Sequence, residues 1–562
     1  MRPKTKFRGM KHLIAYLQQK ISVALILMAL PIWCSAQEWS GMERGECMPD
    51  LTEAEVARRA QLLKNGHRIP PIKDLSGKTE YRQLVILVEF ADCQFSCENP
   101  LDYYNRMFNE SGFTDSQEVT VGSMADYLMD QSNGLFHVTF DVAGPYRVSS
   151  KAKPNPNANS GTRYYGKDAF KEATEMFVAE FPNVDYSQYD WNGDGKVNQV
   201  IFIYAGLAGN QGILTQRRTD PETGEFITDE KGEVVRDTLA ISWGHIWPNT
   251  STISIVRTPN NGPTISNFSC SGERWMIGDI PSMGIGTICH EYMHSLGLPD
   301  IYPTSGDFSP YSVIDAWGLM DGGNFTNYGW CPPNLTALEK MLLGWATPTE
   351  LKEPVNITDM KPGDIYQIKH TDTEYFLLEN RQWTGWDAGL PGRGLVVYYV
   401  DYDPNRWSSN TVNNLYSAND HLHFTMMYAD QRDYASWKAE LANYAIEQRY
   451  KGPHRMHCLY LSDAAYPFIN GTTYNRELTD TSVPAATVYH ANADGQTVLN
   501  KAITNIQMAD DGTISFDFRG GTTDIKEVND VNDDCWYDLQ GRKIGSPTQG
   551  LYIKNGKLIF KK

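Results

Sequence analysis

Residues 290–300 follow the pattern H-E-x-x-H-x-x-G-x-x-D, whose residue types suit a metal site. Two histidines four residues apart share one face of a helix, so His290 and His294 can bind the same ion. Glu291 lies about 100° further round the helix, where a general base for a metal-activated water belongs. Gly297 can adopt the left-handed conformation that ends a helix, which lets Asp300 return as a third ligand. Three protein ligands and one open position are typical of catalytic zinc.

An apolar stripe supports the expected helix. Ile285, Ile288, Tyr292 and Leu296 recur at helical spacing on the face opposite the two histidines. We therefore expect the helix to pack on a core through this stripe and to turn the histidines toward a cleft. The alternative is a buried helix whose two histidines make only hydrogen bonds.

An apolar turn follows at residues 316–323, A-W-G-L-M-D-G-G, and is centred on Met320. It resembles the methionine turn that underlies the zinc histidines in metzincin peptidases. Taken alone, a methionine in such a turn usually fills a gap in the core. In a competing arrangement the third ligand is a glutamate on a later helix, and Glu339 is the available candidate. That arrangement leaves Gly297 with little purpose, so Asp300 is the favoured ligand.

Two further side chains could contribute to the site. Residues 240–245 could supply an edge strand lining the cleft, and His245 at its end could contact substrate. A single histidine is more often structural. Tyr328, which follows the methionine turn, could donate a hydrogen bond in a transition state.

At these residues the chain resembles the immune inhibitor A-like family of secreted metallopeptidases. The resemblance extends over about residues 80–520 and is carried by residues 288–300, 317–323, 338–340, 343–345, 374–381 and 392–397. It implies a zinc-dependent endopeptidase that acts on proteins or peptides outside the cell. His290, His294 and Asp300 would be the ligands of Zn²⁺, and Glu291 the base.

A second metal motif lies at residues 190–201. Oxygen donors at positions 1, 3 and 5, a glycine at position 6 and a main-chain carbonyl at position 7 match a calcium loop. Position 12 is Ile201, and the chain continues as a strand-like run, so this is not a helix-loop-helix EF-hand. We expect a structural Ca²⁺, whereas the alternative is an Asx-rich turn without metal. The candidate ligands are Asp190, Asn192, Asp194, Lys196 and Asn198.

Composition indicates a globular protein, and the N-terminal segment indicates an exported one. The chain has 562 residues, 41% of them hydrophobic, and a formal net charge of −18, which argues against nucleic-acid binding. Residues 1–36 combine a basic start, a short apolar stretch and small residues before Gln37, which predicts a secretory signal peptide. Residues 37–78 resemble a pro-segment. Its Cys47 could occupy the open zinc position as a cysteine switch, or could be a disulfide-bonded or free cysteine.

Without Cys34 of the signal segment, eight of the nine cysteines remain, an even number that permits disulfides in an exported protein. Cys93 and Cys97 are close enough in sequence to bridge locally. Cys289 adjoins His290 but falls toward the core side of the helix. We therefore expect it to be buried or disulfide-bonded rather than a zinc ligand.

The expected fold is an α+β, metzincin-like zinc peptidase domain at residues 79–346, followed by a β-rich, sandwich-like domain at 347–519. A helical insert is expected at 435–450. A polar linker at 520–534 leads to residues 535–562, where Asn555-Gly556 predicts a two-residue hairpin. This end resembles the C-terminal sorting domains of type IX secretion cargo, which implies export and possible attachment to the cell surface. The alternative is a small hairpin that ends an ordinary β domain.

We therefore expect a secreted zinc endopeptidase made as a zymogen, with extracellular proteins or peptides as substrates and no nucleic-acid partner. One alternative is a surface adhesin with a vestigial peptidase site, although the intact base Glu291 disfavours it. The other is a zinc hydrolase of a non-peptide amide. The sequence leaves substrate preference and oligomeric state open.

Overall fold

A computed structural model of the chain describes residues 37–39 and 80–561, with gaps at 116–120, 160–161, 233, 277–281, 305–311, 416–418, 432–462, 470–472, 521–535, 538–542, 546 and 555–556. The predicted signal peptide, most of the predicted pro-segment with Cys47, the predicted insert at 435–450 and all but the first residue of the linker lie outside the described residues. No helix in the described part of the chain has both the length and the apolar character needed to cross a membrane.

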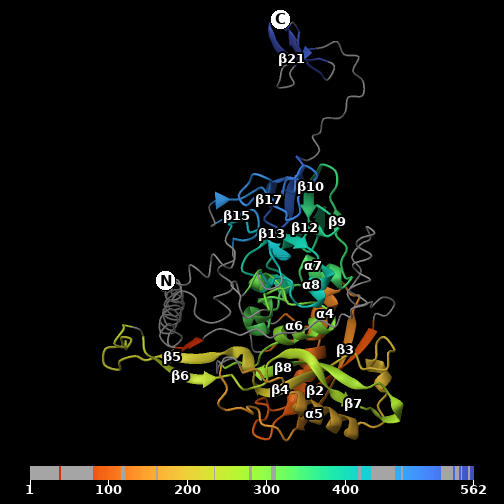
Figure 1. The fold of residues 1–562 in the computed structure, drawn as a ribbon, viewed down its shortest axis with the longest axis vertical. Helices are drawn as coiled ribbons and strands as arrows, with labels where there is room; N and C mark the ends of the chain where they lie inside the picture. Colours follow the sequence, from red (N-terminus) through yellow and green to blue (C-terminus); the bar gives the residue numbers. More distant parts are fainter. Residues whose placement is uncertain are drawn as a thin grey trace, which may run out of the picture.

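A five-stranded sheet forms the base of the molecule, in the order β3-β2-β4-β8-β7 (Figure 1). The first four strands run parallel, and β7 pairs antiparallel with β8 at one edge. The strands are β2 (Glu80–Glu89), β3 (His137–Arg147), β4 (Val200–Leu207), β7 (Asn249–Val256) and β8 (Ile265–Arg274).

Strand β2 shows why this sheet is buried on both faces. Its run of consecutive apolar residues is typical of a central parallel strand. Val85 and Leu87 point into one hydrophobic core, and Leu84 and Ile86 into the other. Helix α5 (Lys167–Glu180) covers one face, and α3 (Pro100–Asn109), α4 (Met124–Gln131) and α6 (Gly286–Ser295) lie on the other. This part is therefore a mixed α/β domain.

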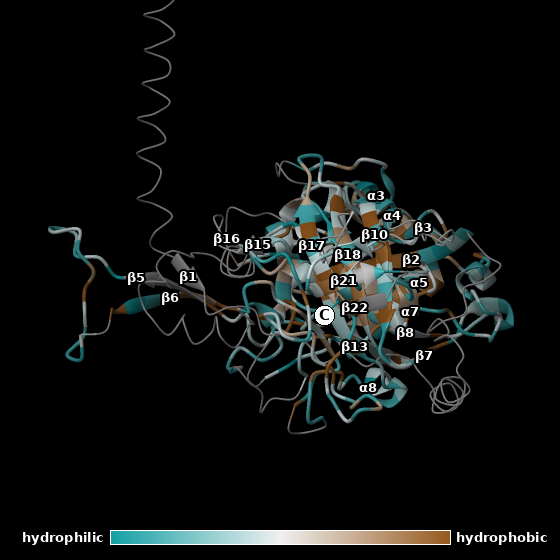
Figure 2. Cartoon of the chain, turned by 90° about the horizontal axis from the view of Figure 1, so that it is seen from above, coloured by the Kyte–Doolittle hydropathy of each residue, from teal (hydrophilic) through white to brown (hydrophobic). Residues whose placement is uncertain are grey.

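A hairpin of β5 (Ile213–Arg217) and β6 (Arg236–Ile241) projects from the side of the α/β domain, with β1 (Gln37–Trp39) paired to β5 (Figure 2). The prediction that residues 240–245 form an edge strand is right only in part, because residues 240–241 end β6, an edge strand of this small sheet, and residues 242–245 lie beyond it. Strand β6 belongs to the hairpin, and the chain then turns through Ser242 and Gly244, which has a φ of 90°. The edge strand next to α6 is β7 instead.

The residues after 347 are rich in β-structure and form two main sheets. The larger has the order β14-β13-β12-β11-β9 and the smaller β10-β18-β17, with a hydrophobic core between them. Their strands are β9 (Thr349–Glu350), β10 (Val355–Met360), β11 (Ile365–Lys369), β12 (Glu374–Arg381), β13 (Gly394–Asp401), β14 (Phe424–Met426), β17 (Ile503–Met508) and β18 (Ile514–Phe518).

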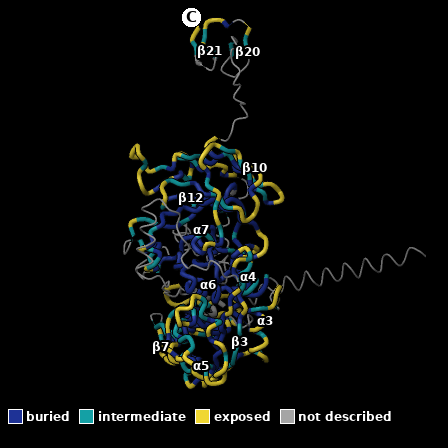
Figure 3. Tube along the Cα trace, turned by 90° about the vertical axis from the view of Figure 1, so that its right-hand side faces the viewer, coloured by how far each residue is buried: buried dark blue, intermediate teal, exposed yellow. Residues whose placement is uncertain are grey.

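The other face of β12 and β13 packs into the core of the α/β domain. Leu377 and Tyr398 belong to the same buried cluster as α6 and α7 (Ala337–Leu342). Figure 3 shows this buried interior running from the α/β sheet through α6 and α7 to β12. One hydrophobic core therefore crosses the boundary predicted at 346/347.

The remaining elements are small. They include α8 (Pro404–Ser408), the pair β15 (Phe468–Ile469) and β16 (Thr473–Tyr474), and a C-terminal sheet in the order β20-β19-β21-β22. That sheet comprises β19 (Trp536–Tyr537), β20 (Lys543–Ile544), β21 (Gly550–Lys554) and β22 (Lys557–Lys561). Lys554 pairs with Lys557, which confirms the predicted hairpin at residues 555–556. Within the described residues, short 3-10 segments lie at 186–189, 209–211, 259–261, 315–317, 323–329 and 385–389.

Candidate metal centre

Helix α6 carries the two histidines between two packed surfaces. Ile288 and Tyr292 are buried in the core shared with α3 and α4, as the apolar stripe predicted. At its start Gly286 lies against the 323–329 segment, where a Cβ atom would come within 2.1 Å of the Asn324 carbonyl oxygen. A side chain at 286 would therefore push the helix away from that segment. The helix ends before Gly297, which has the expected positive φ, here 99°.

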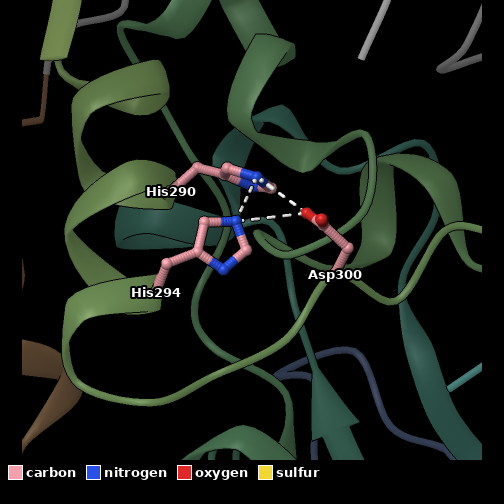
Figure 4. Close-up of side chains that lie close together, drawn as sticks. All are labelled: His290, His294 and Asp300. Carbon is pink, nitrogen blue, oxygen red and sulfur yellow. Dashed lines mark hydrogen bonds and ion pairs between the residues drawn. The ribbon is translucent and has the colours of Figure 1, made fainter. Parts of the chain in front are cut away.

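The two imidazoles are oriented by main-chain carbonyls. His290 Nδ1 lies 2.9 Å from the Leu319 oxygen, and His294 Nδ1 lies 2.7 Å from the Leu298 oxygen. Because a carbonyl only accepts, each Nδ1 carries the proton and donates it, which leaves the lone pair on Nε2. The two Nε2 atoms lie 3.2 Å apart and face Asp300 (Figure 4).

Asp300 completes this group from the loop after α6 (Figure 4). Its Oδ1 lies 3.2 Å from Nε2 of both histidines, and its side chain is fully buried. Asn410 holds the residue from the other side: its Nδ2 donates to Asp300 Oδ2 at 2.8 Å, and its Oδ1 accepts from the Asp300 main-chain N–H at 2.7 Å. Asp300 Oδ1 itself accepts no hydrogen bond from the described residues.

Three electron-pair donors therefore meet in a buried space. Burial by itself lowers the pKa of His290, but Asp300 and Glu291 outweigh it, and the pKa is raised. Burial by itself raises the pKa of Asp300, but His294 and His290 outweigh it, and the pKa falls well below its usual range. The centre is thus electrostatically suited to positive charge, supplied by a proton or by a cation.

The separations fit a divalent metal. The three candidate donor atoms form a triangle with sides of 3.2 Å. In a tetrahedral zinc site with ligand distances of about 2.0–2.1 Å, two ligands lie about 3.3 Å apart. The donors also have the types that zinc prefers, namely imidazole nitrogen and carboxylate oxygen. These three side chains thus need almost no rearrangement to hold such an ion.

Glu291 follows His290 in α6 and is not a member of the three-donor group. The Thr250 hydroxyl lies 3.3 Å from its Oε2 and also donates to its main-chain carbonyl. Ser269 donates to the same carbonyl at 3.0 Å. Strands β7 and β8 therefore both contact α6 at the residue proposed as the base.

The predicted methionine turn supports the site through its main chain. The carbonyl of Leu319 orients His290, and that of Met320 accepts from Ile301 N–H at 2.8 Å, next to Asp300. The turn is closed by the Asp321 carboxylate, which accepts main-chain N–H groups from residues 313, 314 and 315. The Met320 side chain is fully buried in the core.

The other candidate side chains have different partners. Glu339 forms a capping box with Thr336 at the start of α7, and burial raises its pKa. It is not part of the donor group at His290. His245 Nδ1 lies 2.7 Å from the Ser242 oxygen, and burial lowers its pKa, which suits a neutral, structural histidine. The Tyr328 ring packs edge-on against Trp275.

The predicted calcium loop is a compact turn. The Asp190 carboxylate accepts the main-chain N–H groups of Gly193, Asp194 and Gly195 at 2.8–3.1 Å. Asp194 accepts from Lys196 N–H at 2.9 Å. The candidate ligand atoms are thus gathered in one loop, although hydrogen bonds within the loop already use several of them.

Five of the cysteines are described, and all have free thiols. Cys93 and Cys97 do not bridge, so the local disulfide is not formed in this structure. Burial is the main reason that the pKa of Cys97 is raised to about 11. Cys289 is buried in the core and does not face the metal centre, in agreement with its predicted position.

Sequence reasoning missed the side chains that support the centre. Asn410 and Thr250 lie 110 and 41 positions from the residues they contact, on a loop and on an edge strand. Their residue types are common and their spacing is irregular. Only a prediction of the three-dimensional fold could have found them.

The fold and the donor group together define a mixed α/β domain with a candidate metal centre, formed by two histidines of a buried helix and an aspartate of the loop after it. Residues 73–341 match the family described as Immune inhibitor A peptidase M6, catalytic domain. The predicted family resemblance is confirmed over these residues. Beyond residue 341 it stays a prediction.

Curated relatives agree with this match. The chain is 26% identical over 313 residues to Immune inhibitor A of Bacillus thuringiensis subsp. alesti, covering 48% of this chain and 41% of the relative. It is 24% identical over 338 residues to the Pre-pro-metalloprotease PrtV of Vibrio cholerae serotype O1, covering 53% of this chain and 34% of the relative. The chain thus spans less than half the length of these relatives.

Proposed function

We propose that this chain is an exported, zinc-dependent endopeptidase that is made as a zymogen and cleaves extracellular proteins or peptides. The observation that carries the proposal is the buried triangle of His290, His294 and Asp300, in which Asp300 Oδ1 accepts no hydrogen bond. The match to a peptidase family and two relatives named as a metalloprotease and as Immune inhibitor A support the reaction class.

The zinc ligands in this proposal are Nε2 of His290, Nε2 of His294 and Oδ1 of Asp300. Zinc in such a site polarises the carbonyl of the scissile peptide bond and makes water more acidic. Leu319, Leu298 and Asn410 hold the three side chains in the orientation that this binding requires. We therefore regard Asn410 as a positioning residue for the site.

Glu291 acts in this mechanism as the proton carrier. It takes a proton from the attacking water and delivers it to the leaving amine. Thr250 fixes the main chain of Glu291 and contacts its carboxylate, so the base approaches from the β7 side. Among the described strands, β7 has a neighbour on only one side. Its open edge can pair with an extended peptide, which suits cleavage within a chain.

Replacement of the base tests the mechanism. Glu291→Gln keeps the size of the side chain and leaves the three ligands in place, so we expect normal zinc content but kcat/KM lowered by about 10²–10⁴-fold. Casein or peptide-library digestion with and without a zinc chelator measures the activity, and elemental analysis measures the metal. Glu175→Gln, on the exposed side of α5, is the matched control. Unimpaired hydrolysis by the Glu291 variant would exclude this mechanism.

The nature of the substrate needs a separate comparison. The purified protein is incubated separately with protein substrates and with cell-wall or glycan amides under the same conditions. We expect cleavage of proteins only. Cleavage of the glycan amides alone would point instead to a zinc hydrolase of non-peptide bonds.

Two finer parts of the proposal concern stability and location. We propose that the 190–198 loop binds a structural Ca²⁺. We further propose that residues 1–36 direct export and that the C-terminal sheet is a sorting domain of the type IX kind. Secretion assays of full-length and truncated chains test the second point.

A further inference from the structure

A second group of metal-binding residue types lies in the β-rich part of the chain. Asp401 ends β13, and His421 and His423 precede β14, which pairs with β13. One candidate ligand atom from each lies within 4.8 Å of the other two. This group shares no residue with the centre at His290.

Three imidazoles surround one carboxylate oxygen in this group. Asp401 Oδ2 lies 2.9 Å from His421 Nε2, 3.8 Å from His423 Nδ1 and 3.8 Å from His490 Nδ1. A simple ion pair needs only one imidazole. Nitrogen donors from several histidines around a carboxylate are the ligand set of zinc, copper or nickel.

Each imidazole is also anchored through its Nδ1 atom. His421 Nδ1 lies 2.9 Å from Asp420 Oδ1, His423 Nδ1 lies 2.7 Å from the main-chain oxygen of Asp401, and His490 Nδ1 lies 3.0 Å from Glu374 Oε2. The acceptor at His421 Nδ1 leaves Nε2, the atom nearest Asp401 Oδ2, able to bind a metal. In His423 and His490 the atom nearest Asp401 Oδ2 is Nδ1, so each must exchange its Nδ1 hydrogen bond for the ion. The Tyr489 ring stacks on His421 at 3.6 Å and fixes its plane.

The group is accessible from solvent. Asp401, His421, His423 and His490 line a cavity of about 640 Å³. Asp401 and His423 are buried, whereas the His490 side chain is 51% exposed and lies at the open side. An ion can therefore enter past His490 and reach donors that are already shielded from water.

We propose that Asp401, His421 and His423, with His490 at the open side, form a second binding site for a divalent transition metal such as zinc. The 2.9 Å separation of Asp401 and His421 needs little change, whereas the wider separations must contract around the ion. The site is therefore less preorganised than the His290 centre and should bind zinc more weakly.

The second metal would stabilise the segment that supports the first site. Asn413, between the two sites, accepts from the His423 main-chain N–H at 3.0 Å and donates to the Ile301 carbonyl at 2.8 Å. Asn410 in the same segment holds Asp300. Fixing residues 421 and 423 to Asp401 restrains both ends of this segment, so the role is structural.

Zinc stoichiometry of the full chain tests the proposal. The double variant His421→Gln/His423→Gln should bind one zinc ion fewer per chain than the parent, in the wild-type background and in a His290→Ala/His294→Ala background. His137→Gln, a partly exposed histidine elsewhere, is the control and should leave stoichiometry unchanged. Equal zinc content in the double variant and the parent overturns the proposal. Because zinc content is measured in both backgrounds, zinc at the second site can be counted whether or not the His290 centre binds zinc.

A single substitution tests the proposal if circular dichroism shows that the double variant does not fold. His490→Gln changes a half-exposed side chain and should fold. We expect about tenfold weaker zinc binding at the second site, measured by titration in the His290→Ala/His294→Ala background. Unchanged affinity in that variant, with the double variant unfolded, also overturns the proposal, because His421 would then serve only as a bridge between Asp401 and Asp420.

Discussion

Asp300 depends on a side chain from a distant part of the chain. Asn410 forms two hydrogen bonds with it, one to the carboxylate and one from the main-chain N–H. Asn410 itself has a φ of 55°, a left-handed conformation that asparagine tolerates better than most residues. Both the amide group and this backbone preference favour asparagine at the position.

Replacing Asn410 with alanine should therefore weaken zinc binding without removing a ligand. Loss of such an outer hydrogen bond typically lowers metal affinity by about 10–100-fold. Competition with a zinc chelator of known affinity measures the change. Asn405→Ala, exposed on α8, should bind zinc like the wild type. Equal affinities for the two variants would show that Asn410 does not position the ligand.

At the scale of residues, the distance between residues along the chain determines which groups of side chains can be predicted from the sequence. His290, Glu291 and His294 lie within one helical turn, so their arrangement could be predicted from the 3.6-residue period. The second group of histidines was not predicted, because Asp401 and His490 are separated by long stretches of chain. One local signal was present: His421 and His423 are two positions apart, which places both on the same side of an extended segment.

At the scale of elements, a buried arginine connects the two halves of the molecule. Arg381, at the end of β12, makes two hydrogen bonds to Asp387 at 2.6 and 2.7 Å. It also donates to the carbonyls of Trp317, in the methionine-turn region, and Asn334, before α7. Burial by itself lowers the pKa of Arg381, but Asp387 outweighs it and the pKa is raised. The guanidinium therefore stays charged and holds β12 against the site region.

Removal of the Arg381 charge should lower the free energy of unfolding. In Arg381→Met the Asp387 carboxylate stays buried without its partner, and we expect a loss of about 3–5 kcal/mol in the free energy of unfolding. Chemical denaturation with urea measures the difference. Arg218→Met breaks an exposed ion pair with Asp237 and is the control. A similar midpoint for both variants would contradict the connecting role of Arg381.

The 190–198 loop allows a test by metal removal. Calcium that binds only the folded chain stabilises it, by about 2.7 kcal/mol at 100 times the Kd. A calcium-selective chelator should therefore lower the Tm of the wild type by several degrees. Asp194→Ala should have the lower Tm already and should not respond to the chelator. A wild-type Tm that is independent of calcium would mean that the loop is held by its own hydrogen bonds.

Prediction of elements worked where the apolar pattern was strong. The run around Leu84 and the stripe on residues 285–296 both became buried elements. The edge strand expected at residues 240–245 was found only in part, because β6 ends at Ile241 and the edge strand next to α6 is β7. Residues 240–245 and 249–256 both have extended, mixed-polarity sequences, and only tertiary pairing distinguishes them. Gly244, with positive φ, was the local sign that the first stretch turns.

At the scale of the whole molecule, the α/β domain and the β-rich sheets form one folded body around the candidate metal centre. They share a core that includes Leu377 and Tyr398, and Asn410 reaches the centre from the loop between β13 and β14. The C-terminal sheet is different: among the described strands, its four strands pair only with one another, and the sheet lies apart from that body in Figure 1. The sequence pattern predicted the α/β domain, the β-rich part and the C-terminal piece. It could not show that the α/β domain and the β-rich part share a core.

Two truncated chains test whether the β-rich part belongs to the folded body and whether the C-terminal sheet is separate from it. A chain ending at residue 519 retains β18, Asn410 and the shared core, so we expect unchanged kcat/KM and Tm but loss of export or of surface attachment. A chain ending at residue 401 removes Asn410 and β14, and should lose both zinc binding and stability. Peptide hydrolysis, thermal melts and cell fractionation measure the three properties. If the chain ending at 519 were as unstable as the shorter one, the C-terminal sheet would have to be part of the enzyme's fold rather than a separate sorting element.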